Sequence, residues 1–546
     1  MIRIDHVSFT YDGSEVPALF DVDLEIGEGE LCVVIGTTGA GKSTLLRSMN
    51  GLVPHATGGR MAGSVVVSGR STRDHPPREF ADLVGLVGQN PASSFVTDVV
   101  EDELAYTMEN LGIAPAAMRR RVEDTLDLLG LHELRQRPLR TLSGGQQQRV
   151  AIGAVLAASP RVLVLDEPTS ALDPAAAEEV LASLARLVHD VGLTVVIAEH
   201  RLERVLPFAD RVILVPGVGR RLQTGPPSEV MRDAPVAPPL VELARVAGWL
   251  PVPLSVRDAR RVAGPLRERL NAAGMAGSAA PAASVCEVVA RVDRASFAYD
   301  TLVALHGIVL DVRAGEVVAL MGRNGSGKST LLSLLAGARR PTTGTVLVRG
   351  AAPHGLTPRK LVRLVGLIPQ DAQLLLYAES VADECAAADR EGDLEAGTTE
   401  ATLESLVPLV PRDRHPRDLS EGQRLALAMA VVLAHDPALL LLDEPTRGLD
   451  YPSKARLEGI LDRLTAAGTA VVIATHDVEL VAKVADRAVL LADGEIVADG
   501  PAREVVCHSA VFAPQVAKVF APGEWLTVDE VSAALSSEQV GGENPR

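Results

Sequence analysis

Residues 36–44, GTTGAGKST, and residues 322–330, GRNGSGKST, are two versions of one glycine-rich segment. An apolar run precedes each of them, LCVVI before Gly36 and VVALM before Gly322, and a run with helical periodicity follows. This order predicts a buried strand, a tight loop and a helix. Glycines let backbone N–H groups turn inward, and a helix N-terminus adds positive potential, so each loop is suited to holding phosphate oxygens.

Both segments fit the pattern GxxxxGK[ST] in the strand–loop–helix context that it requires, which makes the signal strong. We expect each lysine to contact the β- and γ-phosphates of a nucleotide and each following serine to ligate Mg²⁺. The predicted ligands are Gly36, Gly39, Gly41, Lys42, Ser43 and Thr44 in the first segment and Gly322, Gly325, Gly327, Lys328, Ser329 and Thr330 in the second.

The chain as a whole is a long repeat. VLVLDEPTSALD from Val162 returns as LLLLDEPTRGLD from Leu439, and VVIAEH ending at His200 returns as VVIATH ending at His476. We therefore expect one core domain per copy, with the small, uncharged segment Gly274–Ser284 as a flexible linker. The expected divisions are a first domain at 1–240, an extension and linker at 241–285, a second domain at 286–520 and a tail at 521–546. Before the linker, 256–271 is expected to form a short helix interrupted at Gly264-Pro265.

An acidic pair follows a four-residue apolar run in each copy. Asp166 and Asp443 end the runs VLVL and LLLL, so each is placed at the carboxyl edge of a buried strand, where it can hold Mg²⁺ through water. Glu167 and Glu444 come next and are candidates to polarise the attacking water. A purely structural, helix-capping role for the pairs is the competing interpretation.

These motifs, with two more, resemble those of ABC ATPases along nearly the whole chain. LSGGQ at 142–146 matches the signature that separates ABC ATPases from other phosphate-loop enzymes, and LSEGQ at 419–423 is a near match. The resemblance implies an α/β protein with two P-loop NTPase domains of ABC type. Each domain would have a mainly parallel sheet core, an antiparallel β part and a helical signature subdomain.

The resemblance also implies roles for four pairs of residues. Tyr11 and Tyr299 match an aromatic that stacks on adenine, and Gln89 and Gln370 match a glutamine that touches Mg²⁺ and the transmembrane partner. Asp173 and Asp450 match the D-loop aspartate, and His200 and His476 match a switch histidine at the γ-phosphate.

In ABC ATPases each active site is divided between two domains, so the resemblance implies that the copies pair within the chain. ATP binding would close the pair, and hydrolysis would reopen it. One site would combine Lys42, Asp166, Glu167 and His200 with Ser420 and Gly422, and the other would combine Lys328, Asp443, Glu444 and His476 with Ser143 and Gly145. Glu421 replaces the first signature glycine, and a carboxylate near the γ-phosphate would weaken the first site unless it points to solvent.

Composition bears on the partners. The net charge of −17 argues against a general nucleic-acid binder, because phosphate backbones require clustered Lys and Arg. No signal peptide is visible in the polar start, and no apolar run approaches the ~20 residues that span a bilayer, so we expect another chain to cross the membrane. The four cysteines, Cys32, Cys286, Cys385 and Cys507, have no metal-binding spacing and suggest reduced cytosolic thiols.

Three uses of a tandem ABC motor compete. After Gln89, the stretch VEDE–ENLG resembles ATPases of the energy-coupling-factor and cobalt type, as does AEHRLERV from Ala198. That favours an importer motor at the cytoplasmic face of the cell membrane, working with a transmembrane scaffold and a small membrane protein that binds a vitamin or metal ion. A tandem sugar importer and a soluble translation factor on ribosomes are the alternatives. The cargo is not encoded here, because the motor touches the scaffold and not the solute.

Overall fold

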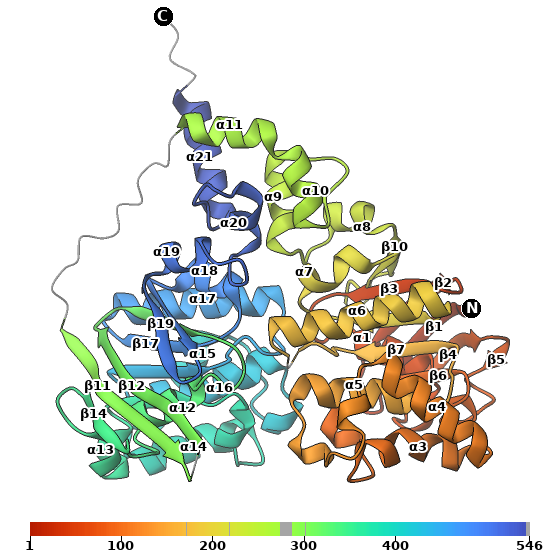
Figure 1. The fold of residues 1–546 in the computed structure, drawn as a ribbon, viewed down its shortest axis with the longest axis horizontal. Helices are drawn as coiled ribbons and strands as arrows, with labels where there is room; N and C mark the ends of the chain where they lie inside the picture. Colours follow the sequence, from red (N-terminus) through yellow and green to blue (C-terminus); the bar gives the residue numbers. More distant parts are fainter. Residues whose placement is uncertain (171, 218, 274–286, 301, 542–546) are drawn as a thin grey trace, which may run out of the picture. The chain divides into compact units, whose positions relative to one another are not determined.

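The computed structural model describes residues 1–546 except 171, 218, 274–286, 301 and 542–546 (Figure 1). The described residues divide into two compact units, Met1–Ser255 and Val256–Arg546, and each unit is described by itself. The predicted linker Gly274–Ser284 and the cysteine at 286 lie outside the described residues.

The first unit contains two sheets. One has the order β10-β9-β3-β8-β7-β6, with only β9 and β10 antiparallel, and the other is the antiparallel sheet β2-β1-β4-β5. The strands are β1 Ile2–Thr10, β2 Leu19–Ile26, β3 Leu31–Ile35, β4 Arg60–Val67, β5 Arg70–Ser71, β6 Val84–Val87, β7 Val162–Asp166, β8 Thr194–Ala198, β9 Arg211–Leu214 and β10 Gln223–Gly225. The helices are α1 Lys42–Ser48, α2 Leu52–His55, α3 Val100–Asn110, α4 Pro115–Leu128, α5 Gly144–Leu156, α6 Pro174–Val191, α7 Leu202–Val205, α8 Pro227–Asp233 and α9 Pro239–Ala247.

The second unit repeats this plan. Its mainly parallel sheet has the order β15-β16-β17-β13-β18-β19, and its antiparallel sheet has the order β12-β11-β14. The strands are β11 Val288–Tyr299, β12 Leu302–Arg313, β13 Val317–Met321, β14 Thr343–Val348, β15 Val365–Ile368, β16 Leu439–Asp443, β17 Ala470–Ala474, β18 Arg487–Ala492 and β19 Glu495–Pro501. The helices are α10 Val256–Val262, α11 Gly264–Ala273, α12 Lys328–Leu335, α13 Pro358–Leu361, α14 Val381–Gly392, α15 Thr398–Leu406, α16 Glu421–Leu433, α17 Tyr451–Ala466, α18 Val478–Val484, α19 Ala502–Cys507, α20 Gln515–Phe520 and α21 Val528–Gly541.

The central strands are aliphatic and buried on both faces. Every residue of β3, β7, β8, β13 and β17 is buried, which is why these strands, apart from Asp166 and Thr194 at strand ends, are continuous apolar runs and do not alternate. The helices α3, α4 and α5 contact one another as a helical subdomain, as do α14, α15 and α16 in the second unit (Figure 1). The predicted combination of parallel core, antiparallel part and helical subdomain is therefore confirmed for both copies.

The helices that follow the first copy pack on the second unit. The expected interruption is confirmed, because α10 ends at Val262 and α11 begins at Gly264. Here α10 contacts α20 and α11 contacts α21, and the guanidinium of Arg267 donates to the carbonyl oxygen of Val519 at 2.8 Å. The side chains of Leu266 and Leu270 are buried, so this segment is an integral part of the second unit.

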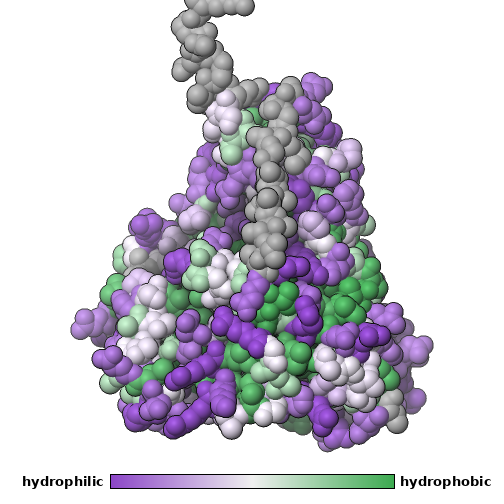
Figure 2. Space-filling model, turned by 90° about the vertical axis from the view of Figure 1, so that its left-hand side faces the viewer, coloured by the Kyte–Doolittle hydropathy of each residue, from purple (hydrophilic) through white to green (hydrophobic). Residues whose placement is uncertain are grey.

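On the face shown in Figure 2, hydrophilic residues predominate and apolar residues form separate patches between them. Among the described residues, no helix is both long and apolar enough to span a bilayer.

Candidate functional site

The predicted phosphate loops have the backbone that their glycines require. Gly41 and Gly327 cap α1 and α12 with φ angles of 103° and 104°, in the left-handed region. A Cβ atom at Gly327 would lie 2.9 Å from the carbonyl oxygen of Ala304, and one at Gly41 would collide with the carbonyl oxygen of Ala18. Any other residue at either position would therefore push the loop away from the neighbouring strand.

The two loop lysines are buried and folded over their loops. The ammonium group of Lys42 donates to the carbonyl oxygens of Gly36 and Thr37 at 3.0 and 3.1 Å. Lys328 does the same to Gly322 and to the next carbonyl, at 2.7 and 3.0 Å. Each ammonium thus lies at the mouth of a loop whose helix N-terminus attracts anions, the arrangement expected for holding a polyphosphate.

Each loop serine lies beside its predicted magnesium aspartate. The hydroxyl groups of Ser43 and Ser329 hydrogen-bond Asp166 and Asp443, although burial is the larger influence and raises the pKa of both carboxyl groups. A hydroxyl and a carboxylate at the edge of a phosphate loop are the oxygen ligands that Mg²⁺ accepts, and bound Mg²⁺ would neutralise phosphate charge there. The donor set therefore fits the ion in both copies.

The two candidate catalytic glutamates share an unusual backbone. Glu167 and Glu444 have φ angles of 52° and 49°, a left-handed conformation that is uncommon for residues with a side chain. Each is held by a hydrogen bond from its N–H group to the neighbouring strand, with Ala198 and Ala474 accepting at 2.9 and 2.8 Å. Strained backbone of this kind concentrates at functional sites, and no motif in the sequence predicts it.

Each glutamate contacts the predicted switch histidine of its own copy. The Oε1 atom of Glu167 lies 2.9 Å from Nε2 of His200, whereas Oε2 of Glu444 lies 2.8 Å from Nδ1 of His476. The histidines come two residues after β8 and β17 end. The structure thus brings together residues separated by more than thirty positions in the chain.

The first copy adds a glutamine to this contact. The amide Nε2 of Gln89 donates to Oε2 of Glu167 at 3.0 Å. Gln89 therefore connects the loop before α3 to the candidate hydrolytic centre in the first copy.

The predicted adenine-stacking tyrosines differ in their surroundings. Tyr11 and Tyr299 approach the loop threonines through their hydroxyl groups, with oxygen–oxygen distances of 2.9 Å to Thr44 and 3.4 Å to Thr330. In the second copy the guanidinium of Arg339 also lies 4.6 Å from the centre of the Tyr299 ring. A cation stacked on this ring is a feature that sequence reasoning missed.

Each signature motif lies at the N-terminus of a helix that it caps. Ser143 and Ser420 are the N-caps of α5 and α16, and each forms a capping box with the glutamine three residues later. Asp173 and Asp450 likewise cap α6 and α17 with their side chains. The serines and D-loop aspartates therefore have a structural role in the isolated units besides the predicted one.

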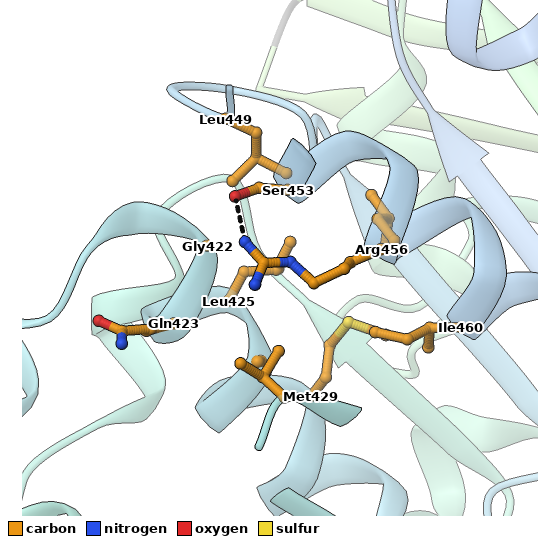
Figure 3. Close-up of a pocket in the computed structure, with 11 residues that line it drawn as sticks. Gly422, Gln423, Leu425, Met429, Leu449, Ser453, Arg456 and Ile460 are labelled. Carbon is orange, nitrogen blue, oxygen red and sulfur yellow. Dashed lines mark hydrogen bonds between the residues drawn. The ribbon is translucent and has the colours of Figure 1, made fainter. Parts of the chain in front are cut away.

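The second signature glycine is required by packing. A Cβ atom at Gly145 would lie 2.8 Å from Cβ of Ala176 on α6, and one at Gly422 would lie 2.7 Å from the hydroxyl oxygen of Ser453 on α17. Figure 3 shows the small pocket beside Gly422, where Arg456 donates to Ser453 at 3.2 Å above apolar side chains of α16. The glycine thus lets the signature helix approach the helix that follows the D-loop.

The carboxylate of Glu421 is paired. It accepts from Arg424 at 2.6 Å, one turn along α16, and Arg424 also donates to the carbonyl oxygens of Arg417 and Leu419 at 2.9 and 3.1 Å. Gln147 occupies the position of Arg424 in the first copy, where the signature has glycine in place of glutamate. The two substitutions in the second copy therefore compensate each other in charge.

Comparison with protein families gives one assignment for both copies. The family model described as ABC transporter matches residues 19–170 and 305–447. The chain belongs to the ABC transporter family. An ABC transporter ATP-binding protein from Streptomyces avermitilis is 58% identical over 98% of this chain and 100% of its own length. Another, from Methanosarcina acetivorans, is 34% identical over 97% of this chain and 90% of its own length.

The tandem architecture of this ABC protein has a counterpart among solved structures. The structure described as a model of ribosome-bound archaeal Pelota and ABCE1 superposes with a TM-score of 0.61 and 22% identity, covering 91% of this chain and 79% of that one. At this identity the likeness shows the fold alone. The family assignment implies ATP hydrolysis, and the geometry above places the required residue types around two phosphate loops.

Proposed function

We propose that this chain is the ATP-hydrolysing, Mg²⁺-dependent motor of an ABC importer of the energy-coupling-factor type, at the cytoplasmic face of the cell membrane. Its partners are a transmembrane scaffold and a small membrane protein that binds a vitamin or a metal ion. The two copies pair within the chain, and each signature completes the nucleotide site of the other copy. The sequence similarity after Gln89 and around His200 supports the importer type.

The observation that carries the proposal is the bond from Gln89 to Glu167 at 3.0 Å. Gln89 begins the loop that leads to α3, so a partner that moves this loop would alter the surroundings of the glutamate directly. In this mechanism Glu167 accepts the proton of the attacking water, and His200, in contact at 2.9 Å, orients the carboxylate. Ser43 and Asp166 would hold Mg²⁺, which would neutralise charge at the phosphates when bound.

The acidic segment that favours this subtype has two distinct parts. Glu103 is buried and accepts from the N–H groups of Val96 and Thr97 at 3.0 and 2.8 Å, so it shapes the loop. Asp102 is exposed, and its neighbour Glu101 pairs with Gln136. Asp102 is therefore, with Glu109 further along α3, an exposed acidic group of this segment that a basic scaffold segment would reach.

Co-expression with a candidate multi-span scaffold tests the proposal. The chain is expected to enter the membrane fraction with the scaffold and to hydrolyse ATP faster when assembled. Asp102→Asn should weaken this association. Asp124→Asn, which removes a carboxylate from the neighbouring helix α4, serves as the matched control. A chain that stays out of the membrane fraction beside its scaffold and sediments with ribosomes would establish the translation-factor alternative.

A further inference from the structure

The first copy contains a buried carboxyl group that the mechanism above does not use. Glu199 lies between β8 and His200 and is 2% exposed. Its Oε1 atom accepts from the hydroxyl group of Thr169, which is fully buried, and its Oε2 atom accepts from the N–H group of His200 at 3.2 Å. The carboxyl group thus connects the switch histidine to the loop that carries Glu167.

The carboxyl group of Glu199 has the properties of a group that orients its neighbours through hydrogen bonds and not through its charge. Burial is the largest influence on its pKa and raises it, and the nearby Glu167 raises it further. A buried carboxyl group costs free energy unless its hydrogen bonds are made. Both oxygens of Glu199 have such partners, so the side chain acts as a bridge between two loops.

The second copy lacks this carboxyl group. Thr475 replaces Glu199, and its hydroxyl group lies 3.5 Å from Oε2 of Glu444. Thr446 corresponds to Thr169, and its hydroxyl oxygen has no hydrogen-bond partner among the residues that the structure describes. The connection that Glu199 makes in the first copy is therefore missing from the second.

The second copy fixes its switch loop by another contact. Asp477, which follows His476, pairs with Lys454 on α17 at 2.7 Å, and both side chains are largely buried. In the first copy Arg201 and Ala177 stand at these two positions. In the first copy the switch loop is thus attached through Glu199 to the loop after the catalytic glutamate. In the second copy it bonds Glu444 itself, through the hydroxyl group of Thr475 and the N–H group of His476 at 3.5 and 3.4 Å, and it is also attached to the following helix.

We propose that Glu199 is a positioning residue for hydrolysis in the first copy, acting through Thr169 and the backbone of His200 to hold the histidine against Glu167. The inference rests on the proposed ATP hydrolysis and adds that the two copies orient their switch histidines by different means. Removing the bridge should lower the rate of the chemical step in the first copy and leave nucleotide binding unchanged, because Glu199 touches no phosphate-loop residue in any contact described above.

The two threonines give a matched pair of variants for the test. In the full chain carrying Glu444→Gln, which leaves hydrolysis to the first copy, Thr169→Val should lower kcat about tenfold, the loss expected for one buried hydrogen bond that orients a catalytic group. The KM for MgATP should stay within twofold. Thr169→Ser, which keeps the hydroxyl group, should restore most of the activity, and Thr446→Val should change nothing.

A double-variant cycle separates positioning from general destabilisation. Glu199→Ala should resemble Thr169→Val, and the two together should be no worse than either alone, because both remove the same bridge. If the Glu444→Gln parent is inactive while the unmodified chain hydrolyses ATP, the copies act together, and the same variants in the unmodified chain should show the same losses.

Equal kcat values for Thr169→Val and Thr446→Val, or losses that multiply in the double variant, would overturn the bridge. The proposed function would instead be overturned if the unmodified chain hydrolysed no ATP, or if its hydrolysis did not depend on Glu167.

Discussion

The pairing of Glu421 with Arg424 predicts that the altered signature is tolerated because its charge is neutralised. Glu421 is about two-fifths exposed and Arg424 is largely buried, with side-chain exposures of 42% and 13%. An ion pair of this kind, one turn apart on a helix, contributes about 0.5 kcal/mol. Glu421→Gly should therefore lower the free energy of unfolding of the second unit by about 0.5–1 kcal/mol and change ATP turnover less than twofold.

Arg424→Gln should have a larger effect. The guanidinium bonds to the carbonyl oxygens of Arg417 and Leu419 would be lost. A glutamine can keep only the third contact of Arg424, with the carbonyl oxygen of Pro416, as Gln147 does with Leu139 at 3.2 Å in the first copy. Two lost bonds from a charged, mostly buried donor correspond to about 2–3 kcal/mol. Arg424→Gln also leaves the carboxylate of Glu421 unpaired, so the KM for MgATP should rise.

Urea unfolding and steady-state MgATP hydrolysis of the full chain measure both effects. The double variant Glu421→Gly with Arg424→Gln recreates the first copy's residues, and it should recover the KM of the unmodified chain while remaining less stable. An Arg424→Gln variant with unchanged stability and unchanged KM would show that Arg424 neither stabilises α16 nor neutralises Glu421. A Glu421→Gly variant that hydrolyses ATP several times faster would show that the carboxylate repels nucleotide despite its partner, and that the first site is the weaker one.

Three further outcomes are expected. Glu167→Gln combined with Glu444→Gln should lower ATP turnover by about two to four powers of ten while MgATP binding persists, and near-normal turnover would contradict their assignment as bases. Gly422→Ala should destabilise the second unit by about 1–3 kcal/mol in urea unfolding through overpacking against α17, and an unchanged midpoint would show that the helices can separate freely. Arg211→Gln should lower the free energy of unfolding by about 1 kcal/mol at neutral pH. The guanidinium of Arg211 donates to the carboxylate of Glu30 at 2.9 and 3.2 Å and holds the pKa of Glu30 below its ordinary value. Since a lowered carboxyl pKa stabilises the fold only above the unfolded value of about 4.3, the difference between the variant and the unmodified chain should shrink as the pH falls below that value, and a difference that persists in acid would refute the electrostatic origin.

Much of each copy could be predicted because its signals are local. The phosphate loops, their flanking strands and helices, and the strands ending at Asp166 and Asp443 follow from short patterns of apolar residues and glycine. The contacts that connect these segments could not be predicted. The left-handed backbone of Glu167 and the bridge from Glu199 to Thr169 depend on which loops the sheet order brings together.

The close repetition of the motifs also concealed differences between the copies. Arg339 on the ring of Tyr299 and Arg424 beside Glu421 are ordinary arginines in the sequence, and only their spatial neighbours distinguish them. A close repeat of motifs therefore predicts a shared fold and a shared set of site residues, whereas the way in which each copy orients those residues depends on long-range packing.

The packing of α10 and α11 on α20 and α21 determines where the gene could be divided. A cut within Gly274–Ser284, the segment that looks most like a spacer, would leave Leu266 and Leu270 on the first fragment without their apolar surroundings. A cut between Ser255 and Val256 would keep those helices with the fragment they stabilise. Two polypeptides divided there are the better starting point for reconstituting the motor from separately purified halves.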